Sequence, residues 1–316
     1  MNNFTLYTPT KVVFGKETEN QTGALVKEFG CKKVLLHYGG HSVVKSGLLD
    51  RVCASLTKEG IAYVLLGGVV PNPRLSKVRE GIDLGRKEQV DMILAVGGGS
   101  VIDSAKAIGY GLTNDCDVWD IYEGKQKPTA CLPIGVVLTI AATGSEMSDS
   151  AVITNEDGWI KRGYSSDYCR PKFAVMNPEI TYTLPTYQTF SGGADILMHT
   201  MERYFTTTKD TQFTDAISEA LLVNTMHFLR VLLKDPKDYN ARAQVMWAGS
   251  ISHNGQTGVG LQSDFATHKL EHELSGLYDC AHGAGLTALW GSWARYVRKT
   301  DIGVLHSLRS GLPVPR

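Results

Sequence analysis

Two short segments of the sequence gather the side chains that could bind a metal ion. Asp195 and His199 are four residues apart, so on a helix both side chains project from one face, one turn apart. Farther along the chain, His268, His272 and His282 fall within fifteen residues. Carboxylate and imidazole groups suit Fe(II) or Zn(II), and the choice between these ions stays open. The spacing leads us to expect one divalent ion bound by Asp195, His199, His268 and His282.

Each of these residues alone has an ordinary explanation, because a single helical histidine more often packs in the core or faces solvent than binds metal. Glu202, one turn after His199, could orient a ligand from behind or could be a solvated acid. We expect His227, His253 and His306 to be surface or helix-packing residues, because each stands apart from any acid or glycine cluster. The metal hypothesis therefore depends on the joint pattern.

A glycine-rich turn, Gly97-Gly98-Gly99-Ser100, directly follows the apolar run 91–96 and opens a helical pattern. Glycine at such a turn lets the backbone approach a phosphate, and the helix N-terminus supplies N–H donors and partial positive charge. The turn lacks the G-x-G-x-x-G spacing of an ordinary Rossmann dehydrogenase. We interpret it as a pyrophosphate-binding turn; a plain loop is the alternative.

A second turn, Tyr-Gly-Gly-His-Ser at residues 38–42, follows another apolar run. An acid after this kind of strand would accept a hydrogen bond from the ribose 2′-hydroxyl of NAD and repel the 2′-phosphate of NADP. No Asp or Glu occurs from this turn to Leu49, and small donors such as Ser42 are present. The turn therefore favours NADP(H), with an ordinary turn as the alternative, and we expect His37 and His41 to line the cofactor pocket.

The elements that would position these turns alternate along the first half of the chain. Strand-like apolar runs and helical patterns in alternation are typical of parallel βαβ units, and continuously apolar runs suit a sheet covered on both faces. The expected strands are residues 12–15, 33–37, 62–66, 91–96 and 132–138, and the expected helices are 43–56, 75–87 and 101–109.

After about residue 185 apolar residues recur at spacings of three and four, and strand-like runs vanish. The pattern predicts an α/β dinucleotide-binding domain at residues 1–185 and an all-helical metal-binding domain at residues 186–316.

Composition argues against several classes of protein. Lys+Arg and Asp+Glu both number 32, so no basic field attracts nucleic acid or an anionic membrane. No apolar run approaches the roughly 18–20 residues of a spanning helix, and the N-terminus does not read as a signal peptide. Six cysteines without a CxxC pair argue against a disulfide framework. We expect a soluble cytoplasmic enzyme.

Taken jointly, the motifs resemble the iron-containing (group III) alcohol dehydrogenases, of the NADPH-dependent butanol dehydrogenase and broad-range aldehyde reductase branch. The resemblance covers the chain to about residue 299, in the family's order. It is carried by Gly97–Asp103 with Ala105-Lys106-Ala107, residues 138–146, Asn177-Pro178, Thr183-Leu184-Pro185, Asp195-x-x-x-His199-x-x-Glu202, and the block His268, His272, His282-Gly283.

The resemblance implies a dehydroquinate synthase-like architecture with the active site in the cleft between the two domains. It implies hydride transfer between NADP(H) and a short-chain primary alcohol or aldehyde, such as butanol and butanal, with the four metal ligands named above. His272 matches the family's non-ligand histidine near the nicotinamide, a candidate proton relay. Cofactor contacts are implied for Gly39, Gly40, Ser42, Gly97, Gly98, Gly99, Ser100, Asp103, Thr139, Thr143 and Lys161. A homodimer is the expected assembly.

Three departures from the family pattern stand out. Leu138 and Ala142 replace a usual Pro and Gly, and Ser148 lies near a usual Asn. After Thr300 the sequence does not resemble the family's continuation, so we expect a truncated or altered C-terminus that leaves apolar faces uncovered. The alternatives are a zinc enzyme of the glycerol dehydrogenase or dehydroquinate synthase type, or a truncated inactive homologue that binds only nucleotide or metal.

Overall fold

The structure, a computed structural model, describes residues 1–298 and divides into two compact units. The α/β unit contains residues 8–140 and 145–183, and the helical unit contains residues 1–7, 141–144 and the chain from residue 184 on. The predicted fold class, α/β first and all-helical second, is confirmed. Residues 1–7 and 141–144 group with the helical unit, although they precede the predicted boundary near residue 185. The division at residues 1–185 and 186–316 stays a prediction. The predicted change after about residue 300 lies outside the described residues.

A six-stranded sheet forms the centre of the α/β unit. Its order is β1-β8-β5-β4-β2-β3, and every neighbouring pair is parallel. The strands are β1 (Lys11–Phe14), β2 (Lys33–Tyr38), β3 (Ala62–Leu66), β4 (Met92–Gly97), β5 (Ile134–Leu138) and β8 (Phe173–Met176). The strands β4, β5 and β8 are buried along their whole length, which is why they read as unbroken apolar runs.

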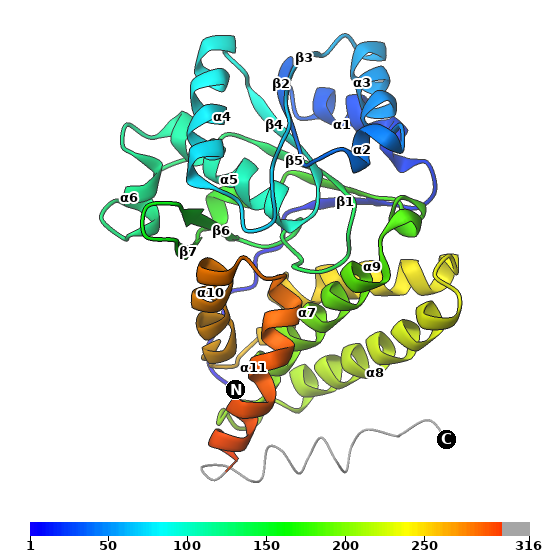
Figure 1. The fold of residues 1–316 in the computed structure, drawn as a ribbon, viewed down its shortest axis with the longest axis vertical. Helices are drawn as coiled ribbons and strands as arrows, with labels where there is room; N and C mark the ends of the chain where they lie inside the picture. The colour runs from blue at the N-terminus through cyan, green and yellow to red at the C-terminus, as the bar shows by residue number, and fades with distance from the viewer. Residues whose placement is uncertain (299–316) are drawn as a thin grey trace. The chain divides into compact units, whose positions relative to one another are not determined.

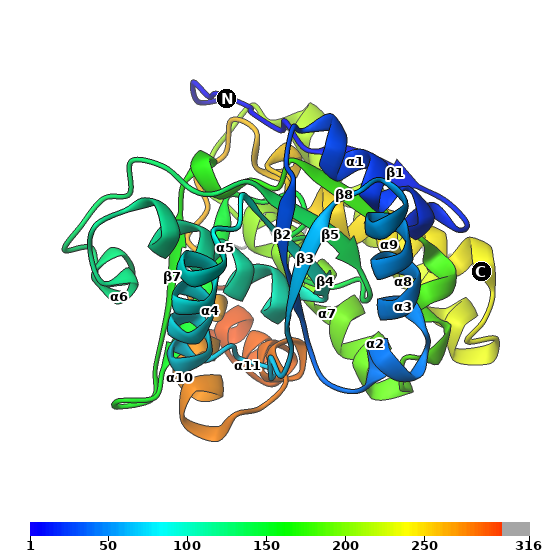
Figure 2. The ribbon, with the colours of Figure 1, turned by 90° about the horizontal axis from the view of Figure 1, so that it is seen from above.

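Helices cover both faces of this sheet, as Figures 1 and 2 show. One face carries α1 (Thr22–Glu28), α2 (Ser42–Lys45) and α3 (Leu48–Lys58), and the other carries α4 (Leu75–Glu88), α5 (Gly99–Thr113) and α6 (Val118–Tyr122). Glycines bring α4 and α5 close together. A Cβ at Gly81 would lie 2.4 Å from Ile108, and one at Gly111 would lie 2.2 Å from Ile82.

The expected elements are present with shifted ends, and several short ones were missed. The expected helix 43–56 is two helices, because the chain takes a left-handed conformation at Gly47 (φ 68°). The strand β8 is too short for a clear pattern. The antiparallel hairpin of β6 (Ser150–Asn155) and β7 (Ile160–Ser165) was missed because β7 is largely polar and part-exposed.

The first turns of α5 hold the chain that leads into this hairpin. Lys106 is fully buried, and its Nζ donates to the carbonyl oxygens of Ser145 (2.8 Å), Ser148 (3.0 Å) and Ser150 (2.8 Å). Asp103 accepts hydrogen bonds from Ser145 Oγ (2.6 Å) and the backbone N–H of Val152 (3.0 Å). Because a buried ammonium group requires such partners, segment 145–152 is fixed to the helix that opens at the glycine turn.

The helical unit is built around α7 (Thr186–Tyr204). The helix α7 packs against α8 (Gln212–Lys234), α9 (Tyr239–His253) and α11 (His282–Val297). The helix α10 (Ala266–Tyr278) packs against α11. The apolar core includes Ile196, Leu221, Leu229, Leu232 and Val245.

By length and composition, one helix in the described part of the chain, α8, could cross a membrane; its apolar window has a mean hydropathy of 1.3. The helix is not an unbroken apolar run, because Asp215, Glu219 and Arg230 interrupt it. Leu221, Leu229 and Leu232 of α8 are buried in the core of the helical unit. A core helix of a bundle passes the same test, so this helix is weak evidence for a membrane.

His37 lies in the core of the α/β unit, fully buried in β2. Its Nδ1 donates to the carbonyl of Leu66 (3.0 Å), so its Nε2 accepts from Ser104 Oγ (2.9 Å) in α5. The expectation that His37 lines a cofactor pocket is wrong, because both ring nitrogens are engaged inside the protein. Burial lowers the pKa of His37 from 6.5 to about 4.

This buried histidine predicts a loss of stability in mild acid. The unfolded chain binds a proton at this residue below about pH 6.5 and the folded protein only below about pH 4, so stability falls as the pH drops through that window. The free energy of unfolding should fall by about 2 kcal/mol more between pH 7 and pH 5 in the wild type than in His37→Gln. Urea unfolding at the two pH values measures this difference. Leu36→Ala, a buried neighbour in β2, is the control and should keep the wild-type pH dependence.

Candidate metal centre

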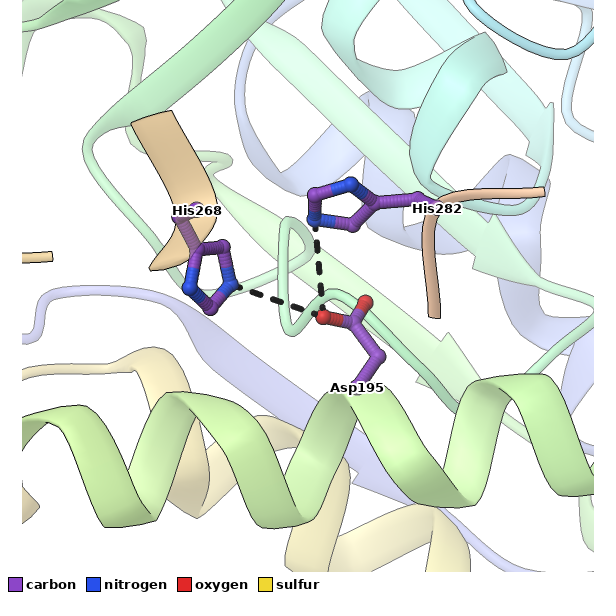
Figure 3. Close-up of side chains that lie close together, drawn as sticks. All are labelled: Asp195, His268 and His282. Atoms are coloured by element: carbon purple, nitrogen blue, oxygen red, sulfur yellow. Dashed lines mark ion pairs between the residues drawn. The ribbon is translucent and has the colours of Figure 1, made fainter. Parts of the chain in front are cut away.

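Three side chains from three helices converge in the helical unit. Figure 3 shows Asp195 of α7 facing His268 of α10 and His282, the first residue of α11. Asp195 Oδ1 lies 3.7 Å from His268 Nε2 and 3.6 Å from His282 Nε2. Asp195 and His268 are buried, and His282 is half-buried.

Glycines make this convergence possible. A Cβ at Gly283 would lie 1.9 Å from the carbonyl oxygen of Ser191, so only glycine lets the start of α11 meet α7. A Cβ at Gly193 would lie 2.5 Å from Leu229, and α8 approaches α7 there. The glycine-rich residues after His282 are thus the first turn of α11, and they place the imidazole beside Asp195.

The distances fit a divalent ion. Metal–ligand bonds of about 2.0–2.2 Å at tetrahedral angles put ligand atoms about 3.4 Å apart, close to the spacing observed. Asp195 Oδ1 and His268 Nε2 are buried, and neither makes a hydrogen bond of normal geometry within residues 1–298. Orphaned buried polar atoms destabilise a protein. A cation between them would satisfy both atoms.

His199 stands beside this group. Its Nδ1 lies 3.1 Å from both the carbonyl oxygen and Oδ1 of Asp195, and its ring centroid is 4.4 Å from that of His268. A carbonyl oxygen only accepts, so Nδ1 carries the proton and Nε2 keeps its lone pair. The ligand atoms of Asp195, His268 and His282 lie within 4.8 Å of one another, and this group does not include His199. The structure thus unites three of the four expected ligands, and ligation by His199 stays a prediction.

Two carboxylates orient the histidines from behind. Glu202 Oε2 pairs with His268 Nδ1 at 2.6 Å, and Oε1 accepts from the backbone N–H of Thr267 at 2.7 Å. Glu271, fully buried, pairs with His282 Nδ1. Each carboxylate holds the proton on Nδ1 and leaves Nε2 as a ligand atom, the arrangement common behind metal-bound histidines.

Glu202 therefore orients a ligand histidine from behind, which is one of the two roles expected for it from the sequence. Glu271 was not among the expected residues. Its signal was present, because Glu271 lies three residues after His268 and so shares its helix face. The space for its carboxylate comes from Gly285, where a Cβ would lie 2.8 Å from Glu271 Oε1.

The electrostatics of the cluster favour a cation. Three acidic side chains, Asp195, Glu202 and Glu271, are buried in this cluster, and the buried guanidinium of Arg203 lies against His199 and His253. Burial raises the pKa of Asp195, but His199 and His282 outweigh it and hold this pKa well below its usual range. Burial lowers the pKa of His199 to about 4, whereas at His268 the effect of burial is outweighed by Asp195 and Glu202, which raise the pKa. A charged carboxylate and a neutral imidazole are the forms that bind metal.

His253 is a helix-packing residue, one of the two environments expected for it, but it packs against the cluster itself. Its ring centroid lies 4.2 Å from that of His199, and its Nδ1 accepts from Arg203 at 3.0 Å. Arg203 also donates to the carbonyl of His199 at 2.9 Å and stacks on Phe265 at 4.6 Å. Nothing in the local sequence signals this contact, because α7 and α9 are far apart in the chain. His227 is exposed on α8 as expected, and His306 lies outside the described residues.

His272 lies on α10 one turn after His268 and is half-buried. Its ring centroid is 5.8 Å from that of His282. It therefore stands beside the cluster, and its role as proton relay stays a prediction.

The expected phosphate turns lie in the α/β unit, at one edge of the sheet. Gly97 ends β4 and Gly99 begins α5, while Gly39 and Gly40 follow β2, the parallel neighbour of β4. A Cβ at Gly98 would lie 2.2 Å from Ile140, so only glycine fits at this position. The first N–H groups of α5, including that of Ser100, have no partner within the helix and can bind an anion.

The other expected cofactor residues fall in different surroundings. The backbone N–H of Thr139 donates to Gly97 O at 3.1 Å, and Lys161 is buried with its Nζ 2.9 Å from Asn72 Oδ1. Asp103 uses both carboxylate oxygens to hold segment 145–152. Ser42 begins α2 and is exposed, as is His41, and Thr143 belongs to the helical unit. Cofactor contacts by these residues stay predictions.

Two protein-family models cover most of the chain. "Iron-containing alcohol dehydrogenase" matches residues 9–178, and "Fe-containing alcohol dehydrogenase family, C-terminal" matches residues 189–311. The second match continues past residue 299, where the sequence resemblance was expected to end.

Among similar proteins, NADH-dependent butanol dehydrogenase A of Clostridium acetobutylicum is 42% identical over 95% of this chain and 77% of its own length. The NADPH-dependent aldehyde reductase YqhD of Escherichia coli is 38% identical over 92% of this chain and 76% of its own. The crystal structure of an NADH-dependent butanol dehydrogenase A from Thermotoga maritima has a TM-score of 0.95 and 43% identity, covering 96% of this chain and 76% of that one.

The pairing of Glu202 with His268 predicts a loss of metal affinity in Glu202→Gln. An amide accepts a weaker hydrogen bond from Nδ1 and removes a buried negative charge, so the dissociation constant for Zn²⁺ should rise roughly 10- to 100-fold. Competition with a fluorescent chelator measures it. Glu219→Gln is the control, because Glu219 also accepts a hydrogen bond in this unit but from Tyr204. Equal affinity of Glu202→Gln and wild type would mean that Glu202 does not support the ligand.

Proposed function

Because the chain belongs to the iron-containing alcohol dehydrogenase family, we propose that it transfers a hydride between NADP(H) and a short-chain alcohol or aldehyde, such as butanol and butanal. The observation that carries this proposal is the convergence of Asp195, His268 and His282 on one point, with two carboxylates behind the imidazoles. The names of its relatives, butanol dehydrogenases and an aldehyde reductase, support this substrate class.

A divalent ion held by these residues and His199 would supply Lewis-acid polarisation of the carbonyl oxygen, and a bound nicotinamide would supply the hydride. The protein's own groups do the rest. Glu202 and Glu271 pair with Nδ1 of His268 and His282 and leave Nε2 of each ring facing Asp195. The amides at the start of α5 neutralise the cofactor's pyrophosphate. His272 delivers the proton to the substrate oxygen, directly or through water.

We propose NADP(H) rather than NAD(H) as the cofactor. The turn after β2 offers two glycines and Ser42 but no carboxylate to repel a 2′-phosphate. The relatives include both NADH- and NADPH-dependent enzymes, so the family alone does not choose. Fe(II) or Zn(II) as the ion, a homodimer as the assembly and the cytoplasm as the location complete the proposal.

Removing a metal ligand tests the reaction class. His268→Ala should lose metal and most NADPH-dependent butanal reduction, because it removes one of the four proposed ligands and leaves only Asp195, His199 and His282. Metal analysis and NADPH absorbance give the two readouts, with the exposed His227→Ala as control. Full metal content and turnover in His268→Ala would contradict this site. If metal-loaded wild type binds NADPH but oxidises it with no short aldehyde, the inactive homologue or the dehydroquinate synthase-type reading is favoured.

The proton relay is tested by His272→Ala. The variant should keep the ion at Asp195, His268 and His282 but lose roughly 100-fold in kcat for butanal reduction, the usual contribution of a positioned acid. Steady-state kinetics across pH, with metal content measured in parallel, separate this effect from metal loss. An unchanged kcat and pH profile would remove His272 from the mechanism.

Cofactor choice is tested by Gly39→Asp. A Cβ at Gly39 meets only ordinary contacts, 3.6 Å from Val69 O and 3.7 Å from Val101, so the side chain fits. The new carboxylate should move the ratio of kcat/KM for NADPH over NADH toward NADH by about tenfold or more. Gly40→Ala, where a Cβ meets nothing within 4 Å, is the control and should leave the ratio unchanged.

A further inference from the structure

The imidazole of His282 stands between two sets of ligand groups. Its Nε2 faces Asp195 Oδ1, and in Figure 3 its second ring nitrogen points away from that carboxylate. On that far side, Nδ1 pairs with Glu271. One ligand atom each from Glu271, His272 and His282 lie within 4.8 Å of one another.

We propose that Glu271, His272 and Nδ1 of His282 form a second divalent-cation site, which Zn²⁺ occupies after the first site is filled. One carboxylate and two imidazoles are a common zinc ligand set, and three protein ligands leave a position for water. The ion displaces the proton that Nδ1 shares with Glu271, and this proton is released to solvent. The His282 ring then bridges the two ions as an imidazolate.

The second site is the weaker one. Glu271 already shares the proton on His282 Nδ1, and this proton must leave when the ion binds. A second positive ion across one imidazole is also repelled by the first.

The surroundings allow both binding and access. Glu271 is fully buried and packs beside Gly285, which gives the site one buried carboxylate. His272 and His282 are only half-buried, so an ion can reach them from solvent. Because the ion occupies His272, excess Zn²⁺ should also inhibit aldehyde reduction; this consequence alone rests on the proposed function.

The test is the number of Zn²⁺ ions that the full chain binds at equilibrium. Protein stripped with a chelator is dialysed against increasing Zn²⁺, and bound metal is measured per chain. Wild type should bind a first equivalent tightly and a second one more weakly. His272→Ala and His272→Gln should bind only the first. His227→Ala, which removes an exposed histidine on α8, should bind both.

Three results would overturn the proposal: a single equivalent in wild type at millimolar Zn²⁺, a second equivalent retained in both His272 variants, or loss of both equivalents in folded His272→Gln. The last result would place His272 in the first site. Because stoichiometry needs no substrate, it stands whether or not the enzyme reduces aldehydes. Cu²⁺ loaded into both sites of wild type should show magnetic coupling through the His282 ring by electron paramagnetic resonance, and two uncoupled signals would contradict the bridge.

Discussion

The buried carboxylate of Asp195 is the group on which the helical unit depends. A carboxylate so deeply buried is unfavourable by itself, and here three imidazoles surround it and hold its pKa low. Two further buried acids stand behind two of those imidazoles, so three carboxylates are buried close together. Such an arrangement is unfavourable in an apolar core without a cation. The polar core of this unit is thus organised as a cation site, and its helices are the scaffold for it.

Close packing at glycine is what brings the ligands together. The ligands come from α7, α10 and α11, whose backbones must approach more closely than side chains normally permit. Gly283 against Ser191 and Gly193 against Leu229 remove the obstructing Cβ atoms. A substitution at either glycine would separate helices, and a shift of an ångström at a ligand is enough to spoil coordination. The glycines beside the histidines are therefore as much a part of the site as the histidines themselves.

The α/β unit uses a buried ammonium group in a comparable way. Lys106 gathers carbonyl oxygens from segment 145–150, and Asp103 captures the same segment three residues earlier on α5. The helix that opens at the Gly97–Ser100 turn is thereby fixed to the β6–β7 hairpin, which carries Lys161. From the sequence alone, Lys106 and Asp103 could be taken for solvent-exposed residues. In the structure they hold the non-helical segment 145–152 in place beside the expected phosphate turn.

The sequence alone determined the fold class and most strands of the parallel sheet, and it singled out the glycine turns and three candidate metal ligands, Asp195, His268 and His282, which the structure brings together. These features follow from local signals. The spacing at which apolar residues recur indicates which face of a helix or strand is buried, and residues one helical turn apart lie on the same face. Only the tertiary structure decided which side chains lie against each buried face of a helix or strand. It revealed Glu271 behind His282, His253 against His199 and the burial of His37, because these contacts join elements distant in the chain. Periodicity shows that a side chain is buried, but its partner is set by how helices and strands pack in three dimensions.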